Sequence, residues 1–280
     1  AHALGEGGQV RAKLALDDSV AFRVRFEAAM PLQSSLYFRG PVLSTFDGRE
    51  WRPLLSKFAR RFRPAADLQV SGEPVRYQLT LEPNQRQWLL VLDAAIDKPD
   101  VPELTASMNS ELEWTVAGPI MQALRYSAVS YPQFRHGPAS AVAGLQDYLG
   151  LPNGFNPRTL QLADELRTQA PSANAQELIE LVLQRLRTGG YTYTLEPGVY
   201  GVHSADEFWF DRKEGFCEHI ASSFVILMRA LGIPARIVTG YQGGELNTID
   251  NFWVVRQSDA HAWSEVWIAG QGWVRVDPTS

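Results

Sequence analysis

Residues 207–241 read EFWFDRKEGFCEHIASSFVILMRALGIPARIVTGY and contain Cys217, the only cysteine of the chain. From Cys217 to Leu231 the apolar residues recur at three- and four-residue spacing, which predicts a helix buried along one side. Gly232 and Pro234 are expected to end that helix. The cysteine therefore occupies the first turn, where unpaired backbone N–H groups and the positive end of the helix dipole favour a thiolate.

Residues 259–280, DAHAWSEVWIAGQGWVRVDPTS, contain the partners that a cysteine nucleophile needs. Residues 260–268 alternate small or aliphatic side chains with larger or polar ones, which predicts a strand. A GQG turn at 270–272 then returns the chain as a second strand. In an antiparallel pair the start of one strand lies opposite the end of the other, so we expect His261 and Asp277 at hydrogen-bonding distance. Together with the cysteine they form a set in which the acid orients the base.

The alternative for Cys217 is a structural role, because a lone cysteine is most often a small buried hydrophobic residue. Two other histidines are weaker candidates for the base. His219 follows Cys217 by two residues, about 200° around a helix axis, and is expected to point away from the thiol. His203 lies in a predicted loop with no acid at partner spacing. Glu218 is explained as a carboxylate stabilised by the helix dipole.

Three separated blocks carry a family resemblance: GFCEH-x-ASSF-x-x-LMRALGIPAR-x-VTGY, then HAWSEVW, then GW-x-x-VDPT. Within residues 190–280 this pattern resembles the transglutaminase-like superfamily, whose fold is a circularly permuted relative of papain. The resemblance implies that Cys217 is the nucleophile, His261 the general base and Asp277 the orienting acid. It also implies that an aromatic residue lines the acyl site or helps to hold the oxyanion, and the candidates here are Trp209 and Trp263.

The reaction implied by the resemblance is acyl transfer from a glutamine carboxamide of a protein or peptide to an amine, through a cysteine thioester. A cysteine peptidase or amidase would use the same triad with water as the acceptor, and fold and triad alone do not choose between them. A non-catalytic binding module is disfavoured because all three residue types are present. No cofactor or metal is expected, since the sequence shows no loop of acidic residues with calcium-ligand spacing.

Residues 1–135 are expected to form a β-rich, sandwich-like domain. The clearest strands are VAFRVRFE at 20–27 and VRYQLTLE at 75–82, where apolar and polar side chains alternate. Short alternating strands separated by turn residues are typical of a β-sandwich. Other strands are expected near 36–45, 87–93 and 111–117, with a hairpin turn at Asp47-Gly48.

Residues 136–280 are expected to form the transglutaminase-like, papain-like domain, after a crossing segment at 126–138. Helices are predicted at 139–149, at 157–169 with Pro157 at the first position, and at Ala173–Arg187. The fold class is therefore α+β, with the nucleophile helix packed on an antiparallel sheet. YTYTL at 191–195 is a brief extended segment whose tyrosines line either a substrate groove or the core.

The composition indicates a globular protein with a substantial core: 280 residues, 45% hydrophobic and 20% charged. A net charge of −5 and a pI of about 5.6 disfavour nucleic acid as a partner. A single cysteine excludes internal disulfides and makes a zinc cluster improbable. No apolar run reaches about 18 residues, and AHALGEGGQV is not a signal peptide.

The resemblance extends to a membrane-anchored bacterial member of the family, which implies a location on the periplasmic face of the inner membrane and a role at the cell envelope. The membrane spans would then lie outside this sequence. WRPLLSKFARRFRP at 51–64 mixes basic and aromatic residues and suggests contact with an anionic surface through Arg60, Arg61 and Arg63. The alternative is a solvated loop whose aromatic residues pack inward.

Overall fold

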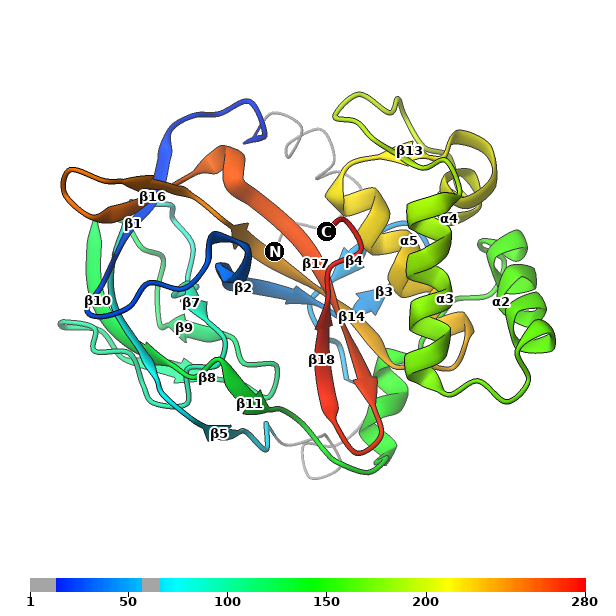
Figure 1. Cartoon of the computed structure of the whole chain (residues 1–280), viewed down its shortest axis with the longest axis horizontal. Helices are drawn as coiled ribbons and strands as arrows, with labels where there is room; N and C mark the ends of the chain where they lie inside the picture. The colour runs from blue at the N-terminus through cyan, green and yellow to red at the C-terminus, as the bar shows by residue number, and fades with distance from the viewer. Residues whose placement is uncertain (1–13, 57–65) are drawn as a thin grey trace.

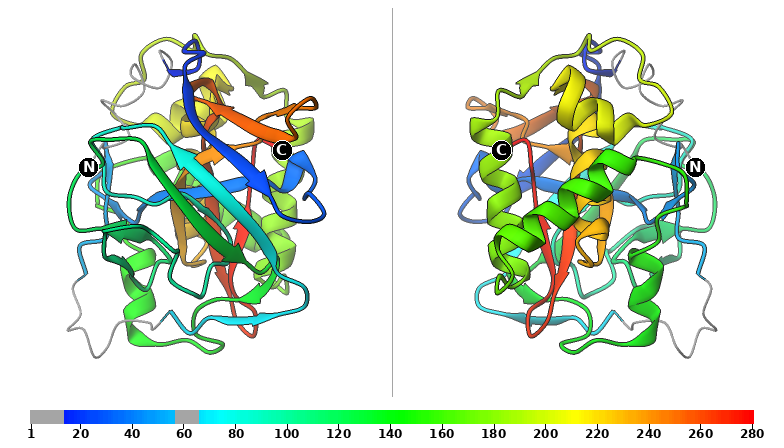
Figure 2. Two further views of the ribbon diagram at one scale, coloured as in Figure 1. Left: turned by 90° about the vertical axis from the view of Figure 1, so that its left-hand side faces the viewer. Right: turned by 90° about the vertical axis from the view of Figure 1, so that its right-hand side faces the viewer.

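The computed structural model describes residues 14–56 and 66–280 and shows three layers: an outer sheet, a central sheet and a layer of helices (Figure 1). Seen from its two sides, the molecule presents a sheet on one face and helices on the other (Figure 2). The central sheet has five strands in the order β18 (Gly272–Val276), β17 (Ala260–Ile268), β14 (Ala235–Gln242), β2 (Tyr37–Leu43) and β7 (Val91–Leu92). The outer sheet has five strands in the order β10 (Leu124–Ser130), β6 (Val75–Leu81), β1 (Val20–Phe26), β16 (Phe252–Arg256) and β15 (Glu245–Asn247).

The helical layer consists of α2 (Pro157–Gln169), α3 (Ala175–Thr188) and α5 (Cys217–Ala230). These three helices occur where the sequence predicts them. Asn174 begins α3 by accepting a hydrogen bond from the backbone N–H of Glu177 at 2.9 Å. The helix expected at 139–149 is a short 3₁₀ segment, η3 (Ala143–Tyr148). The remaining short helical segments are η1 (Gln33–Ser35), α4 (Ser204–Asp206), η4 (Glu207–Arg212) and η5 (Gln257–Asp259).

Four two-stranded sheets complete the structure. They pair β3 (Thr45–Phe46) with β4 (Trp51–Arg52), β5 (Gln69–Ser71) with β11 (Gln133–Arg135), β8 (Ala106–Met108) with β9 (Trp114–Val116), and β12 (Thr192–Tyr193) with β13 (Glu214–Gly215). The turn predicted at Asp47-Gly48 joins β3 to β4. The parallel pair of β12 and β13 brings Tyr193 beside Gly215, two residues before the cysteine.

Two apolar cores separate the three layers. The core between the sheets includes Phe22, Leu79 and Phe38. The core between the central sheet and the helices includes Phe224 of α5 and Val266 of β17. Burial on both sides makes the central sheet a fixed platform for the residues at its ends.

Each five-stranded sheet combines strands from both halves of the sequence. Strand β2 pairs antiparallel with β14, and β1 pairs antiparallel with β16. The register between β2 and β14 shifts between Val238 and Gly240, where the backbone of β2 approaches closely. A Cβ atom added at Gly240 would lie 1.9 Å from the carbonyl oxygen of Phe38, which explains the glycine in the VTGY motif. This approach also places Tyr37, the first residue of β2, opposite Gln242.

A buried ionic cluster lies on the face of the central sheet away from α5. Arg39 of β2 donates two hydrogen bonds to the carboxylate of Glu265 of β17, at 2.7 and 2.8 Å. Arg236 of β14 donates to the same carboxylate at 2.8 Å, and Asp93 lies 3.2 Å from Arg39. All four side chains are nearly inaccessible to solvent. The cluster therefore joins three neighbouring strands through fully desolvated charges.

The basic segment at 51–64 is only partly described by the structure. Arg60, Arg61 and Arg63 lie outside the described residues, so the suggested anionic contact stays a prediction. Trp51, in the same basic segment, is buried, and its indole N–H donates to Ser222 of α5 at 2.9 Å. Among residues 14–56 and 66–280, no helix combines the length and the apolar character needed to cross a bilayer.

Candidate active site

The three candidate catalytic residues come from three elements that meet at one end of the central sheet. Cys217 is the first residue of α5, directly after the N-cap residue Phe216. His261 is the second residue of β17, and Asp277 follows the last residue of β18. Cys217 is buried, with 5% of its surface exposed, and the side chains of His261 and Asp277 are 16% and 7% exposed. A site so placed excludes most water from the sulfur.

The imidazole and the carboxylate lie as the strand pairing predicts. Strands β17 and β18 pair antiparallel, with Ser264 opposite Val276, so the chain after β18 passes the start of β17. The Nε2 atom of His261 is 2.8 Å from Oδ2 of Asp277. This contact confirms the expected proximity of the two side chains.

Asp277 is held on both of its oxygens. Oδ1 accepts hydrogen bonds from the backbone N–H and the hydroxyl of Thr279, at 3.1 and 2.7 Å. Oδ2 accepts from the hydroxyl of Tyr37 at 2.7 Å in addition to its contact with His261. Burial alone would favour the protonated acid, but the hydrogen bonds from His261, Tyr37 and Thr279 outweigh it and hold the pKa of Asp277 at about 2. Asp277 is therefore an anion at neutral pH.

His261 interacts with the cysteine as well as with the aspartate. Burial of the ring disfavours the charged form, but hydrogen bonds to Asp277 and Cys217 outweigh burial and raise the pKa of His261 to about 9. Because Nε2 faces Asp277, the other ring nitrogen is the one available to the sulfur. The imidazole is therefore protonated at neutral pH, between a carboxylate and a thiol, which is the charge state that stabilises a thiolate.

Tyr193 of β12 is a site residue that the sequence did not single out. More than half of the residue's surface is exposed, yet its hydroxyl lies close enough to Cys217 for the cysteine to influence its pKa. Burial of the hydroxyl and the neighbouring thiol raise the pKa of Tyr193 to about 12, so the hydroxyl keeps its proton. The sequence signal for Tyr193 is the YTYTL segment at 191–195, whose tyrosines are expected to line either a substrate groove or the core.

The two tryptophans proposed as substrate or oxyanion residues are both fully buried. Trp209 lies in the core beneath α5, and its indole N–H donates to the carbonyl of Ser223 at 3.2 Å. Its N–H is thus committed to the backbone, and the expectation that Trp209 faces the acyl group is corrected. The ring of Trp263 stacks beside His261, with 6.1 Å between the ring centroids and 23° between the planes. Trp263 therefore supports the imidazole and offers no surface to a substrate.

The two histidines set aside on sequence grounds have structural roles. The Nδ1 atom of His219 accepts a hydrogen bond from the backbone N–H of Phe216 at 3.3 Å, and its ring stacks on Tyr200. Burial lowers the pKa of His219 to about 4, so this ring is neutral. His203 accepts a hydrogen bond from the backbone N–H of Asn156 at 3.0 Å.

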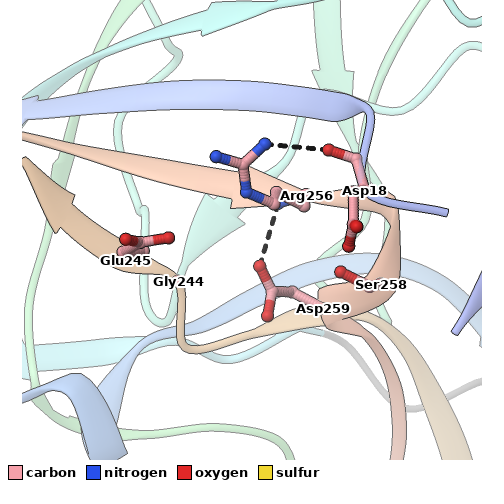
Figure 3. Close-up of a pocket in the computed structure, with 6 residues that line it drawn as sticks. All are labelled: Asp18, Gly244, Glu245, Arg256, Ser258 and Asp259. Atoms are coloured by element: carbon pink, nitrogen blue, oxygen red, sulfur yellow. Dashed lines mark hydrogen bonds between the residues drawn. The ribbon is translucent and has the colours of Figure 1, made fainter. Parts of the chain in front are cut away.

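A polar hollow of about 580 Å³ lies beside the start of β17 but does not include the cysteine, the histidine or the aspartate (Figure 3). Its lining includes Asp18, Glu245, Arg256 and Asp259. Arg256 donates from its guanidinium to the carbonyl of Asp18 at 2.8 Å and from its backbone N–H to Asp259 at 2.9 Å. These contacts tie Arg256 to both sides of the hollow, which is separate from the three candidate catalytic residues.

Comparison with known proteins agrees with the geometry. Residues 161–278 match the family described as the transglutaminase-like superfamily, and residues 9–136 match the TgpA N-terminal domain. The crystal structure of the periplasmic domain of TgpA from Pseudomonas aeruginosa bound to ethylmercury is 36% identical, with a TM-score of 0.88, and the match covers 100% of this chain and 95% of that chain. The chain belongs to the transglutaminase-like superfamily.

Two curated proteins are also similar to the chain. The protein-glutamine gamma-glutamyltransferase of Pseudomonas aeruginosa is 39% identical over 268 residues, which are 96% of this chain and 39% of that protein. The YebA protein of Bacillus subtilis is 34% identical over 139 residues, 47% of this chain and 19% of that protein. The chain thus spans about two fifths of the Pseudomonas relative and a smaller share of YebA. Fold and family are shown: a β-rich N-terminal region is followed by a transglutaminase-like domain.

Proposed function

We propose that the protein is an acyltransferase that moves the γ-glutamyl group of a protein or peptide glutamine to an amine. The observation that carries this proposal is the chain of contacts from Cys217 through His261 to Asp277, because it places a protonated imidazole between the cysteine nucleophile and an orienting carboxylate. The name of the Pseudomonas aeruginosa relative, protein-glutamine gamma-glutamyltransferase, supports the choice of glutamine as the donor.

The first half-reaction forms a thioester. The sulfur of Cys217 attacks the carboxamide carbon of the glutamine, and the C=O bond becomes a C–O⁻ bond in the tetrahedral intermediate. Collapse of that intermediate breaks the C–N bond, and the proton of the His261 imidazolium passes to the leaving nitrogen as ammonia departs. Asp277 stays ionised throughout and holds the ring in place.

The second half-reaction transfers the acyl group. The amine nitrogen attacks the thioester carbon, neutral His261 accepts a proton from that nitrogen, and the C–S bond breaks to return the thiolate. The product is an isopeptide bond, and the imidazolium is restored. Water in place of the amine would give a carboxylic acid, which is the hydrolytic reaction of an amidase or peptidase.

Tyr193 and the backbone N–H of Cys217 are the groups that we assign to the oxyanion. The tyrosine hydroxyl lies beside Cys217, which influences its pKa, and it keeps its proton at neutral pH. An oxygen bound to the carbon under attack would lie near both donors. Fixed donors aimed at a developing negative charge are among the largest contributions to catalysis.

Replacing Tyr193 by phenylalanine removes that hydroxyl and retains the ring. We expect kcat to fall by about 10²-fold, the usual cost of losing one oxyanion donor. Initial rates of labelled-amine incorporation measure the loss. Tyr191→Phe is the matched control. Tyr191 lies two residues before Tyr193 in the sequence, and its hydroxyl donates to the backbone carbonyl of Trp209. Equal rates for the two variants would remove Tyr193 from the mechanism.

The function itself is tested by incubating the protein with a glutamine-containing peptide and a labelled primary amine. We expect Cys217-dependent incorporation of the label, with release of one ammonia for each label incorporated. Ammonia release with a glutamate product and no label would identify the hydrolase. The absence of any thiol-dependent reaction would overturn the enzymatic proposal.

We also propose a periplasmic location, on the face of the bacterial inner membrane, with anchoring segments outside this chain and substrates at the cell envelope. The support is the description of the similar crystal structure as a periplasmic domain. We propose a division of the sequence into a β-rich part at 1–135 and a catalytic part at 136–280, with strands of both parts paired in each five-stranded sheet. The first family match ends at residue 136 and the second begins at residue 161.

A further inference from the structure

Tyr37 connects the N-terminal half of the chain to the proposed catalytic acid. It is the first residue of β2, which with β7 is contributed to the central sheet by the N-terminal half of the chain. Its hydroxyl donates to Oδ2 of Asp277 at 2.7 Å, the same oxygen that lies 2.8 Å from Nε2 of His261. The hydroxyl is therefore one atom removed from the imidazole.

The ring of Tyr37 is held firmly enough to fix that hydroxyl. The residue is buried, with 7% of its surface exposed. The guanidinium of Arg275 lies 4.1 Å from the ring centroid, and the ring of Trp263 packs edge-on at 5.1 Å. Burial first, and then the hydrogen bond to Asp277, raise the pKa of Tyr37, so the hydroxyl always carries a proton to donate.

The effect on Asp277 follows from geometry. Thr279 holds Oδ1 through its backbone N–H and hydroxyl, while Tyr37 and His261 share Oδ2. A carboxylate bound on both oxygens cannot rotate about its last side-chain bond without losing hydrogen bonds. Without the hydroxyl of Tyr37, Oδ2 would keep only the hydrogen bond from His261, whose imidazole gains and loses a proton during the reaction. The hydrogen bond from Tyr37 holds Oδ2 in place while the protonation of the imidazole changes.

We propose that Tyr37 is a positioning residue for the Cys217–His261–Asp277 set, and that the N-terminal half of the chain thereby completes the active site. This inference rests on the proposed function, but the hydrogen bond between Tyr37 and Asp277 can be tested without a substrate. The charged and titratable groups around Asp277 and Tyr37 are His261, Arg275, Tyr193 and Cys217.

The test replaces Tyr37 by phenylalanine, which keeps the ring between Arg275 and Trp263 and removes the hydroxyl alone. We expect kcat/KM for amine incorporation to fall about tenfold with little change in KM, because a hydrogen bond to a charged group is lost and no substrate contact changes. The acid limb of the pH–rate profile should move to higher pH, since this hydroxyl helps to keep the pKa of Asp277 low. Tyr126→Phe is the control, because it removes a buried hydroxyl bonded to the carbonyl of Leu90 at 2.7 Å.

A double-mutant cycle separates positioning from a general loss of folding. In an Asp277→Asn background, Tyr37→Phe should lower kcat/KM by less than a third of the factor seen in the wild type, because the carboxylate that accepts the Tyr37 hydrogen bond is no longer present. An equal effect in both backgrounds, or a loss of activity matched by the loss of alkylatable thiol, would overturn the proposal. So would an unchanged acid limb together with an unchanged kcat/KM.

A substrate-free readout distinguishes failure of this inference from failure of the proposed function. Iodoacetamide alkylation of Cys217 depends on the thiolate–imidazolium pair and needs no acyl acceptor. Slower alkylation at pH 7 in Tyr37→Phe than in the wild type would support positioning even if the wild type transferred no acyl group. Identical alkylation rates in the two proteins would count against Tyr37 whatever the reaction proves to be.

Discussion

Cys217→Ala is expected to abolish amine incorporation, with kcat falling by at least about 10⁴-fold, because the reaction has no other nucleophile to carry the acyl group. The loss should be chemical and not structural. Cys217 is buried at the first turn of α5, and replacing its sulfur by hydrogen costs about 1 kcal/mol of folding free energy or less. Initial rates with a glutamine peptide and a labelled amine, together with a thermal melt, measure the two effects.

A second variant on the same helix controls for disturbance of α5. Ser223→Ala makes a similar truncation at a buried position about 1.7 turns further along the helix. This variant should retain both its activity and its uptake of one alkyl group per chain, whereas Cys217→Ala should take up none. Residual amine incorporation by Cys217→Ala above the uncatalysed rate would show that the thiol is not the acyl carrier.

Glu265→Gln is expected to lower the free energy of unfolding by about 3–5 kcal/mol, because it leaves two guanidiniums buried without their shared anion. Burial by itself disfavours ionised Glu265, but the charges of Arg39 and Arg236 outweigh it and hold the pKa of Glu265 well below its usual range. The folding free energy of a domain is about 5–15 kcal/mol, so this loss is a large fraction of the total. Chemical denaturation followed by tryptophan fluorescence measures it.

The matched control for this variant is Glu82→Gln, which breaks the 3.1 Å pair between Arg23 and Glu82. Both of these side chains are about two-fifths exposed, so water screens the pair and its loss should cost about 1 kcal/mol or less. If the two variants were equally stable, the buried cluster would contribute no more than an ordinary surface pair.

The elements that can be predicted from sequence are those whose pattern is local. The stripe of apolar residues after Cys217, the N1 proline at Pro157 and the alternation from Val20 to Phe26 each specify one element, and each lies where it was expected. The crossing segment predicted at 126–138 is wrong for its first residues, because residues 124–130 form β10 and pair along their whole length with β6. Its pairing partner is remote in sequence, and no local pattern identifies it.

The same distinction applies to the site. His261 and Asp277 are joined by a short hairpin, so strand register alone brings them together. Tyr37 is 240 residues from Asp277 and reaches it only because β2 enters the central sheet beside β14. Trp209 was expected near the acyl group because it precedes the cysteine closely, but its ring turns into the core. Proximity in sequence predicted the contact between His261 and Asp277, and it failed for groups that depend on how the layers pack.

The pairing of early strands with late ones also has a consequence for biosynthesis. Tyr37 pairs with Gln242 and Val20 with Arg256, so synthesis must pass residues 242 and 256 before these strands of the two large sheets can pair. Contacts this distant along the chain fold slowly, and the nascent strands keep unsatisfied edges in the meantime. Strands β1 and β2 are therefore the segments that wait longest for their partners.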